Sequence, residues 1–226
     1  MSYFVTGTDT GVGKTLVSCA LLYGFAAQGK TVVGMKPVAA GCGDDDQNED
    51  VTQLRAASNV LASKGQVNPY SFVQAVAPHL AAHFVGININ LERVLESFSE
   101  LNAQADIVIV EGVGGFRVPL NAEQDSADMA KQMRLPVILV VGMRLGCLNH
   151  ALLTTEAIAS RELTLAGWVA NVLDANMSML NENIAALQQR INAPLLGVIP
   201  YQAARDAREV ASLLDLALLE QAGLHG

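Results

Sequence analysis

Short, almost continuous apolar runs alternate along the chain with longer stretches in which apolar residues recur every three or four positions. The short runs predict strands at residues 3–6, 31–35, 106–111, 136–141, 165–171 and 195–199. The longer stretches predict helices at residues 14–28, 50–58, 91–104, 126–133, 149–161, 177–191 and 205–221. Strands that are apolar at every position are buried on both faces, so the pattern predicts an α/β fold with a doubly wound, mainly parallel sheet flanked by helices.

Two segments show no clear period and are expected to be loops. Residues 41–50 (GCGDDDQNED) are polar and acidic, and residues 67–85 contain Pro69 and Pro78. Loops of this kind gather around the active sites of α/β folds. The chain shows no internal repeat and no linker, so we expect residues 1–226 to form a single domain.

Composition and charge exclude several classes of protein. Apolar residues make up 51% of the chain and charged residues 16%, which favours a well-filled interior. The net charge of −8 argues against a nucleic-acid partner, because there is no basic excess to displace counterions. Three distant cysteines favour a reducing cytoplasm over disulfides or zinc. The early first strand leaves no room for a targeting peptide, and no apolar run reaches the 18 residues of a membrane span.

Residues 7–15 (GTDTGVGKT) lie between the first strand and the first helix, which is the context of a phosphate-binding P-loop. Glycines let backbone N–H groups converge on phosphate oxygens, and the helix N-terminus adds partial positive charge. Lys14 is expected to reach the β- and γ-phosphates of a nucleotide, and the Thr15 hydroxyl to bind Mg²⁺. Five residues separate Gly7 from Gly13, one more than in GxxxxGK[ST], so Thr8 holds the place of the first glycine.

Charged residues follow two of the other predicted strands. Lys36 is either a solvated strand end or a second cation that stabilises charge during phosphoryl transfer. Glu111 matches the Walker-B carboxylate, which helps to hold Mg²⁺. Asp50 closes an acidic run, from which composition alone selects no single metal ligand.

Two further segments carry possible ligand groups. Asn171 ends a predicted strand, and residues 171–174 loosely resemble the NKxD element by which GTPases bind guanine, but the lysine is missing. We therefore expect Asn171 to contact a base without selectivity for guanine. In residues 145–150 (LGCLNH), Asn149 is either the N-cap of a helix or part of an anion site at the helix N-terminus. His79 and His83 are four residues apart, but without a further Cys or His we do not expect a metal there.

The order of several motifs resembles the dethiobiotin synthetase family from residue 3 to about residue 201. The motifs are GTDTGVGKT, GMKPVAAG, the acidic NED, VNPYSF, APH, VEGVGG, PVILVVGMRLGCLNHALLT, LAGWVAN and PLLGVIPY. The resemblance implies synthesis of dethiobiotin from 7,8-diaminopelargonic acid, CO₂ (or bicarbonate) and ATP. In that scheme a substrate carbamate attacks the γ-phosphate to form a carbamic-phosphoric anhydride, and the second amine closes the ring.

The resemblance also implies roles for individual residues. Lys36 and Lys14 are the catalytic cations, and Thr15, Asp50 and Glu111 hold Mg²⁺. The nucleotide-binding set is Gly11, Val12, Gly13, Lys14, Thr15, Leu16, Asp50, Glu111, Gly112, Val113, Gly114, Asn171, Val172, Pro200, Tyr201 and Gln202, with Asn171 reading adenine. The substrate set is Thr10, Lys36, Ala40, Gly146, Cys147 and Asn149. The LGCLNHA turn receives the substrate carboxylate from the partner subunit of a homodimer.

The sequence departs from the family pattern at three places. Ala40 replaces a serine that touches substrate, so that either Cys42 or a backbone amide stands in for it or the contact is lost. The loop before Asp50 is shorter and more acidic than usual, and the residues after Tyr201 match weakly.

Three other functions fit a P-loop protein. A partition- or targeting-type ATPase switch carries a signature lysine five residues before the P-loop lysine, where this chain has Asp9. A non-catalytic nucleotide-binding regulator needs neither Lys36 nor Glu111. An amidoligase-like enzyme for a larger acid is disfavoured by the LGCLNHA turn.

Overall fold

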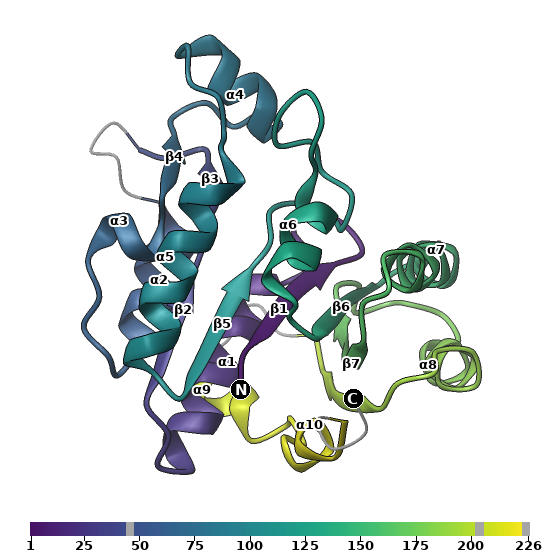
Figure 1. Cartoon of the computed structure of the whole chain (residues 1–226). Coiled ribbons are helices and arrows are strands. Elements are labelled where there is room, and N and C mark those ends of the chain that lie inside the picture. The colour runs from purple at the N-terminus through teal and green to yellow at the C-terminus, as the bar shows by residue number, and fades with distance from the viewer. Residues whose placement is uncertain (44–47, 202–205, 223–226) are drawn as a thin grey trace.

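A six-stranded, wholly parallel sheet forms the centre of the computed structural model, which describes residues 1–43, 48–201 and 206–222 (Figure 1). The strands are β1 (Tyr3–Gly7), β2 (Val32–Met35), β5 (Ile107–Glu111), β6 (Val137–Met143), β7 (Leu165–Val172) and β8 (Leu195–Ile199). They lie in the order β2-β5-β1-β6-β7-β8, so the order reverses beside β1. All six predicted strands and the doubly wound parallel sheet are confirmed.

Helices cover both faces of the sheet, as its apolar strands require. One face carries α1 (Lys14–Ala27), α2 (Glu49–Ala57), α9 (Ala207–Ala211) and α10 (Ala217–Ala222). The other face carries α5 (Leu91–Gln104), α6 (Ser126–Met133), α7 (Cys147–Ser160) and α8 (Leu180–Gln188). Successive residues of β1 point to opposite faces, so that Tyr3 packs in the α1 layer and Phe4 in the α5 layer. No helix among the described residues is long and apolar enough to cross a bilayer.

The predicted loop at residues 67–85 is wrong, because this stretch contains regular structure. The chain forms α3 (Lys64–Val67), β4 (Tyr70–Phe72) and α4 (Pro78–Phe84), and β4 pairs in parallel with β3 (Val38–Ala40). These elements have three to seven residues, too few to show a period along the sequence. The small sheet sits above the carboxyl ends of β2 and β5 (Figure 1). The predicted loop at 41–50 also ends early, since α2 begins at Glu49.

Three of the predicted helices differ from the structure by more than one residue at a boundary. Helix α7 begins at Cys147 with Gly146 as its N-cap, so the assignment of Asn149 as the N-cap is wrong. Helix α8 starts later than predicted because Met179, at φ 55°, precedes it. The predicted helix at 205–221 is split into α9 and α10, and the Asp215 N–H between them donates to the Leu196 carbonyl at 2.8 Å.

Candidate active site

A cavity of about 380 Å³ opens at the carboxyl edge of the sheet, where α/β folds bind their ligands. It is lined by Thr10, Gly11, Gly13, Lys14, Thr15, Lys36, Ala39, Ala40, Asn48, Asp50, Glu111, Val113 and Gly114. The cavity therefore unites most of the expected phosphate, metal and substrate residues. A larger hollow of about 720 Å³ lies between α1 and α9–α10, but it contains none of the P-loop or strand-end groups. The chemistry thus assigns the site to the smaller cavity.

The P-loop adopts a backbone conformation that depends on its glycines. Gly11 and Gly13 have φ of 73° and 92°, which disfavour other residues. The Val12 side chain is buried against Gly7 and Gly142; a Cβ on these glycines would lie 2.5 Å and 2.8 Å from Val12 methyl carbons. The absence of side chains at Gly7 and Gly142 therefore makes room for Val12, which anchors the loop to the sheet.

Two buried lysines enter the cavity from different elements. Lys14 donates from Nζ to the Asp9 carbonyl at 3.0 Å. Burial, followed by repulsion from Lys36, lowers the Lys14 pKa to about 8. Burial alone would also lower the pKa of Lys36, but the adjacent Glu111 and Asp50 carboxylates raise it above its ordinary value. Lys36 is therefore a buried cation held by two carboxylates, and the alternative that it is a solvated strand end is wrong.

Thr15, Asp50 and Glu111 come together as expected of a metal site. The Thr15 hydroxyl lies 2.8 Å from Oδ1 of Asp50 and 2.9 Å from Oε1 of Glu111. The other Glu111 oxygen, Oε2, is buried and has no hydrogen-bond partner among the described residues. Two carboxylates and a hydroxyl are the hard oxygen ligands that Mg²⁺ prefers, and a buried, unpartnered carboxylate oxygen is suited to a cation. These residues fit the expected metal.

The described residues that were predicted to contact the nucleotide base do not line this cavity. Asn171 is fully buried, and its Nδ2 donates to the Val12 carbonyl at 2.7 Å. Val172 is buried, whereas Pro200 and Tyr201 are exposed at the end of β8. Leu16 lines a neighbouring hollow of about 570 Å³ with Asp206 and Glu209. Gln202 and the acidic residues Asp44, Asp45 and Asp46 lie outside the described residues.

The surroundings of Ala40 argue against Cys42 as the substitute for the serine of the family pattern. Ala40 lines the cavity, but Cys42 does not: Cys42 follows β3, and its Sγ lies 3.0 Å from the Oγ of Ser71 on β4. Cys42 is therefore occupied elsewhere and is a poor substitute for the missing serine.

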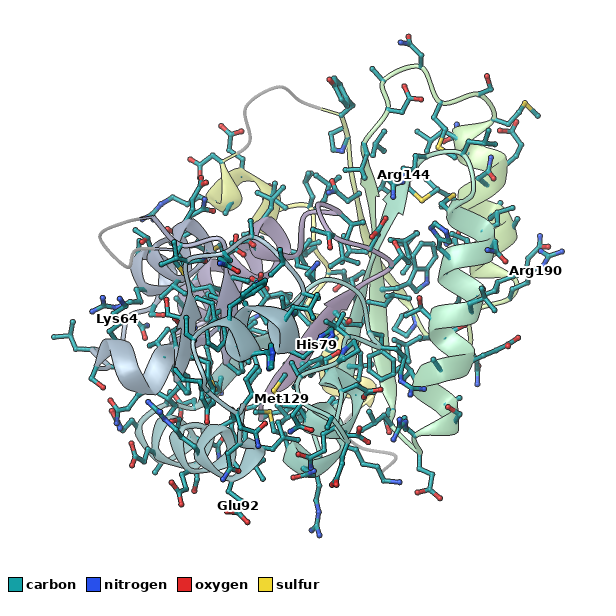
Figure 2. All side chains as sticks on the ribbon, turned by 90° about the horizontal axis from the view of Figure 1, so that it is seen from above. Lys64, His79, Glu92, Met129, Arg144 and Arg190 are labelled. Carbon is teal, nitrogen blue, oxygen red and sulfur yellow. The ribbon has the colours of Figure 1, made fainter. Side chains whose placement is uncertain are left out.

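Two polar groups of the site were missed by the sequence analysis. Asn48 lines the cavity and caps α2, because its side chain accepts a hydrogen bond from the Val51 N–H at 3.3 Å. An asparagine just before an acidic first turn is a sequence pattern that could have predicted this cap. Arg144, which lies between β6 and α7 (Figure 2), pairs with Asp9 of the P-loop at 2.5 Å. No local pattern joins two residues that are so far apart in sequence.

The turn before α7 contains both exposed and buried residues. Leu145 is 99% exposed, whereas Cys147 is buried and its N–H donates to the Arg144 carbonyl at 3.0 Å. Asn149 lies in the first helical turn, where N–H groups lack partners within the helix. His79 and His83 lie on α4, and no group of three or more His, Cys, Asp or Glu side chains suited to a metal occurs among the described residues.

Comparison with known sequences identifies close relatives along nearly the whole chain. A family model described as an AAA domain matches residues 1–208. The ATP-dependent dethiobiotin synthetase BioD of Nitrosospira multiformis is 57% identical over 215 residues, which cover 95% of each chain. The protein of the same name from Aromatoleum aromaticum is 54% identical over 95% of this chain and 97% of its own. That from Ralstonia nicotianae is 51% identical over 96% of each chain.

Solved structures share the fold at much lower identity. A ParA family ATPase from Chlorobium tepidum matches with a TM-score of 0.57 at 15% identity, covering 100% of this chain and 99% of its own. MinD from Aquifex aeolicus matches with a TM-score of 0.57 at 13% identity, covering 99% and 95%. These matches support the fold alone. The partition-type switch is not favoured, since the sequence relatives are synthetases and Asp9 replaces the signature lysine.

Proposed function

The chain belongs to the ATP-dependent dethiobiotin synthetases, and from that premise we propose that it closes the ureido ring of dethiobiotin from 7,8-diaminopelargonic acid, CO₂ and ATP. The observation that carries this proposal is that Lys14 and Lys36 both line the cavity beside the P-loop. A carbamate and a nucleotide triphosphate are both anions, so their approach is costly without fixed cations. Two buried ammonium groups offset that repulsion in a site of low dielectric.

The proposed reaction has three steps. An amine of the substrate adds to CO₂ and loses a proton, which gives a carbamate. A carbamate oxygen attacks the γ-phosphorus, and the bond from that phosphorus to ADP breaks. The second amine attacks the carbamoyl carbon and loses a proton, and phosphate leaves with the C–O bonding pair. We assign Lys36 to the carbamate and transferring phosphoryl group, and Lys14 to the β- and γ-phosphates.

Thr15, Asp50 and Glu111 would hold Mg²⁺. The ion would neutralise negative charge on the β- and γ-phosphates. Thr10 and Ala40 line the cavity and are proposed substrate contacts. With alanine at 40, the contact made by the serine of the family pattern is either taken over by a backbone amide or lost. Gly112, Val113 and Gly114 follow Glu111 and are proposed to border the nucleotide.

We propose that the adenine base lies over the ends of β7 and β8. Asn171 begins the segment that loosely echoes the base-reading NKxD element, and Pro200 and Tyr201 are exposed at the end of the neighbouring strand β8, with Gln202 next in the chain. Leu16 of α1 lines the neighbouring hollow. The Asn171 side chain is fully buried, so its contact with a base requires local rearrangement.

We propose a homodimer in which the substrate carboxylate binds at the partner's α7 turn, near Gly146, Cys147 and Asn149. The exposed N–H groups of a helix N-terminus favour a carboxylate. Leu145 extends fully from this turn, and further exposed apolar side chains follow β4 at Val73 and Val76. Such residues favour burial against a second subunit. The three buried, unpaired cysteines suit the cytoplasm that we propose as the location.

A product assay tests the proposed activity. Purified protein is incubated with ATP, Mg²⁺, bicarbonate and the diamine, and dethiobiotin is measured by mass spectrometry. We expect dethiobiotin and ADP in equal amounts, and ADP formation that depends on the diamine. Folded protein that yields no dethiobiotin beside a working positive-control enzyme would overturn the proposal. ATP turnover that is indifferent to the diamine would instead favour the switch.

A further inference from the structure

The end of β7 is joined to the P-loop by a buried hydrogen bond. Asn171 is fully buried, and its Nδ2 donates to the Val12 carbonyl at 2.7 Å across 159 positions of sequence. A buried amide that gives up such a bond leaves a desolvated carbonyl without its partner, which is costly. The bond therefore fixes the peptide that follows Val12.

The space around this bond is closely fitted. A Cβ on Gly13 would lie 2.2 Å from Asn171 Nδ2, so the carboxamide rests directly against the loop backbone. Gly13 has φ of 92° and is the N-cap of α1, where N–H groups face anions. Asn171 itself does not line the phosphate cavity, whereas Gly13 does. The side chain thus supports the loop from the side opposite the phosphates.

We infer that Asn171 is a positioning residue of the phosphate loop: it holds the Val12–Gly13 peptide so that the Gly13 N–H points into the phosphate cavity. The peptide unit is planar and trans, so its C=O and N–H point in opposite directions. Holding the carbonyl on Asn171 therefore directs the N–H away from Asn171. This role is separate from reading a base, although it rests on the proposed nucleotide site.

A phosphate ligand without a base separates the two roles. A residue that only reads adenine leaves the affinity for inorganic tripolyphosphate unchanged when it is replaced. A residue that orients the P-loop affects tripolyphosphate and ATP alike. The experiment measures the Kd of Mg²⁺–tripolyphosphate and of Mg²⁺–ATP by isothermal titration calorimetry for the wild-type protein, Asn171→Ala and Asn171→Asp. Asn171→Asp keeps the size of the side chain and removes the donor to Val12.

The matched control is Asn183→Ala. Asn183 also donates from Nδ2 to a backbone carbonyl, that of Met179 at 2.7 Å, but this hydrogen bond is exposed and lies on α8, away from the loop. We expect both Asn171 variants to bind tripolyphosphate roughly tenfold or more weakly, as loss of a buried hydrogen bond predicts, and Asn183→Ala to bind it normally. Far-UV circular dichroism and thermal unfolding establish that each variant is folded.

Normal tripolyphosphate affinity in the folded Asn171 variants would overturn the inference, whatever happens to ATP. Unfolding of both variants beside a folded control would also overturn it, because Asn171 would then stabilise the sheet rather than orient the loop. Failure of the proposed function gives a different result: the wild-type protein would bind tripolyphosphate but form no dethiobiotin.

Discussion

The ammonium group of Lys36 lies 2.5 Å from Oε1 of Glu111, and both side chains are buried at the ends of neighbouring strands. The register explains the meeting: Met35 of β2 is opposite Val110 of β5, so the next residue on each strand meets at the sheet edge. Asp50 completes the cluster at 3.0 Å. Removal of one member of a buried ion pair leaves an uncompensated charge, so we expect Lys36 to stabilise the fold in addition to the chemical role that we propose for it.

Substitution Lys36→Met is expected to destabilise the protein and to lower its turnover strongly. The loss of a buried partner costs about 3–5 kcal/mol of unfolding free energy, and loss of a cation beside the transferring group lowers turnover by roughly 10²-fold or more. Urea unfolding and the product assay measure the two effects separately.

Lys131→Met is the control for the Lys36 variant, because Lys131 pairs with Glu162 at 2.9 Å on the exposed surface. Such a pair contributes little, so the control should unfold like the wild-type protein. Equal stability of Lys36→Met and the control would contradict the buried-pair argument, and normal turnover would remove the role assigned to Lys36.

Substitution Thr15→Val should uncouple Mg²⁺ from nucleotide binding. Valine keeps the branched shape but loses the hydroxyl that lies within hydrogen-bonding distance of Asp50 and Glu111. ATP affinity is measured with and without Mg²⁺. We expect Mg²⁺ to strengthen binding to the wild-type protein and to Thr15→Ser, but to have roughly tenfold less effect on Thr15→Val. An unchanged effect of Mg²⁺ on Thr15→Val would exclude this hydroxyl as a ligand.

The lowered pKa of Lys14 predicts pH-dependent nucleotide affinity. Burial, followed by repulsion from Lys36, lowers this pKa to about 8, and bound phosphates raise it again by favouring the charged form. Nucleotide binding above pH 8 therefore takes up a proton, so affinity is greatest below pH 8 and falls as the pH rises through that value. Calorimetry in buffers of different ionisation enthalpy measures the uptake.

The stability effect of Lys14 has the opposite sign. Without nucleotide, the unfolded chain binds more protons than the folded one between the folded pKa of about 8 and the model-peptide value of 10.5, so this group's contribution to stability rises with pH across that window. Lys14→Met should remove both dependences. Affinity that is flat from about pH 7 to 9.5 in the wild-type protein would contradict the assigned pKa.

The sheet and most of the cavity were predictable because both follow from local patterns. Continuous apolar runs define the six strands, and Lys36 and Glu111 stand where two of those runs end. Once the sheet is parallel, strand ends meet at one edge, so the meeting of these side chains follows without knowledge of the loops.

Contacts between distant segments were not predictable from local patterns. Asn68 belongs to the segment expected to be a loop, yet its buried amide donates to the Lys36 carbonyl at 2.6 Å and thereby holds the strand end that carries Lys36. The bond from Asn171 to Val12 and the pair of Arg144 with Asp9 likewise depend on how the chain folds back on itself. A strand-end asparagine looks the same in sequence whether it faces a base or a backbone carbonyl.

Gly13→Ala and Gly11→Ala should differ in effect although both glycines have positive φ. A Cβ at Gly13 would lie 2.2 Å from the Asn171 amide, whereas a Cβ at Gly11 meets no atom within 4 Å. Gly11→Ala carries only backbone strain, about 1–2 kcal/mol. Gly13→Ala adds displacement of Asn171 and should weaken ATP binding at least tenfold more, as measured by calorimetry. Equal effects would show that the contact with Asn171 is unimportant.

Substitution Leu145→Glu is expected to split the proposed homodimer. Leu145 is 99% exposed beside the α7 turn that we assign to the partner's substrate, so a charge there would be buried without a partner on dimerisation. Leu61→Glu is the matched control, because Leu61 is also 99% exposed but lies between α2 and α3. Sedimentation velocity measures the assembly, and KM for the diamine measures the substrate site.

We expect Leu145→Glu to be monomeric with a raised KM for the diamine, because each site then lacks the turn supplied by the other subunit. Its affinity for Mg²⁺–ATP should be unchanged, since the P-loop belongs to the same chain as Lys36. Leu61→Glu should retain the wild-type assembly and KM. A dimeric Leu145→Glu with normal KM would place the interface elsewhere, and a wild-type protein that sediments as a monomer with full activity would remove the need for a partner at the substrate site.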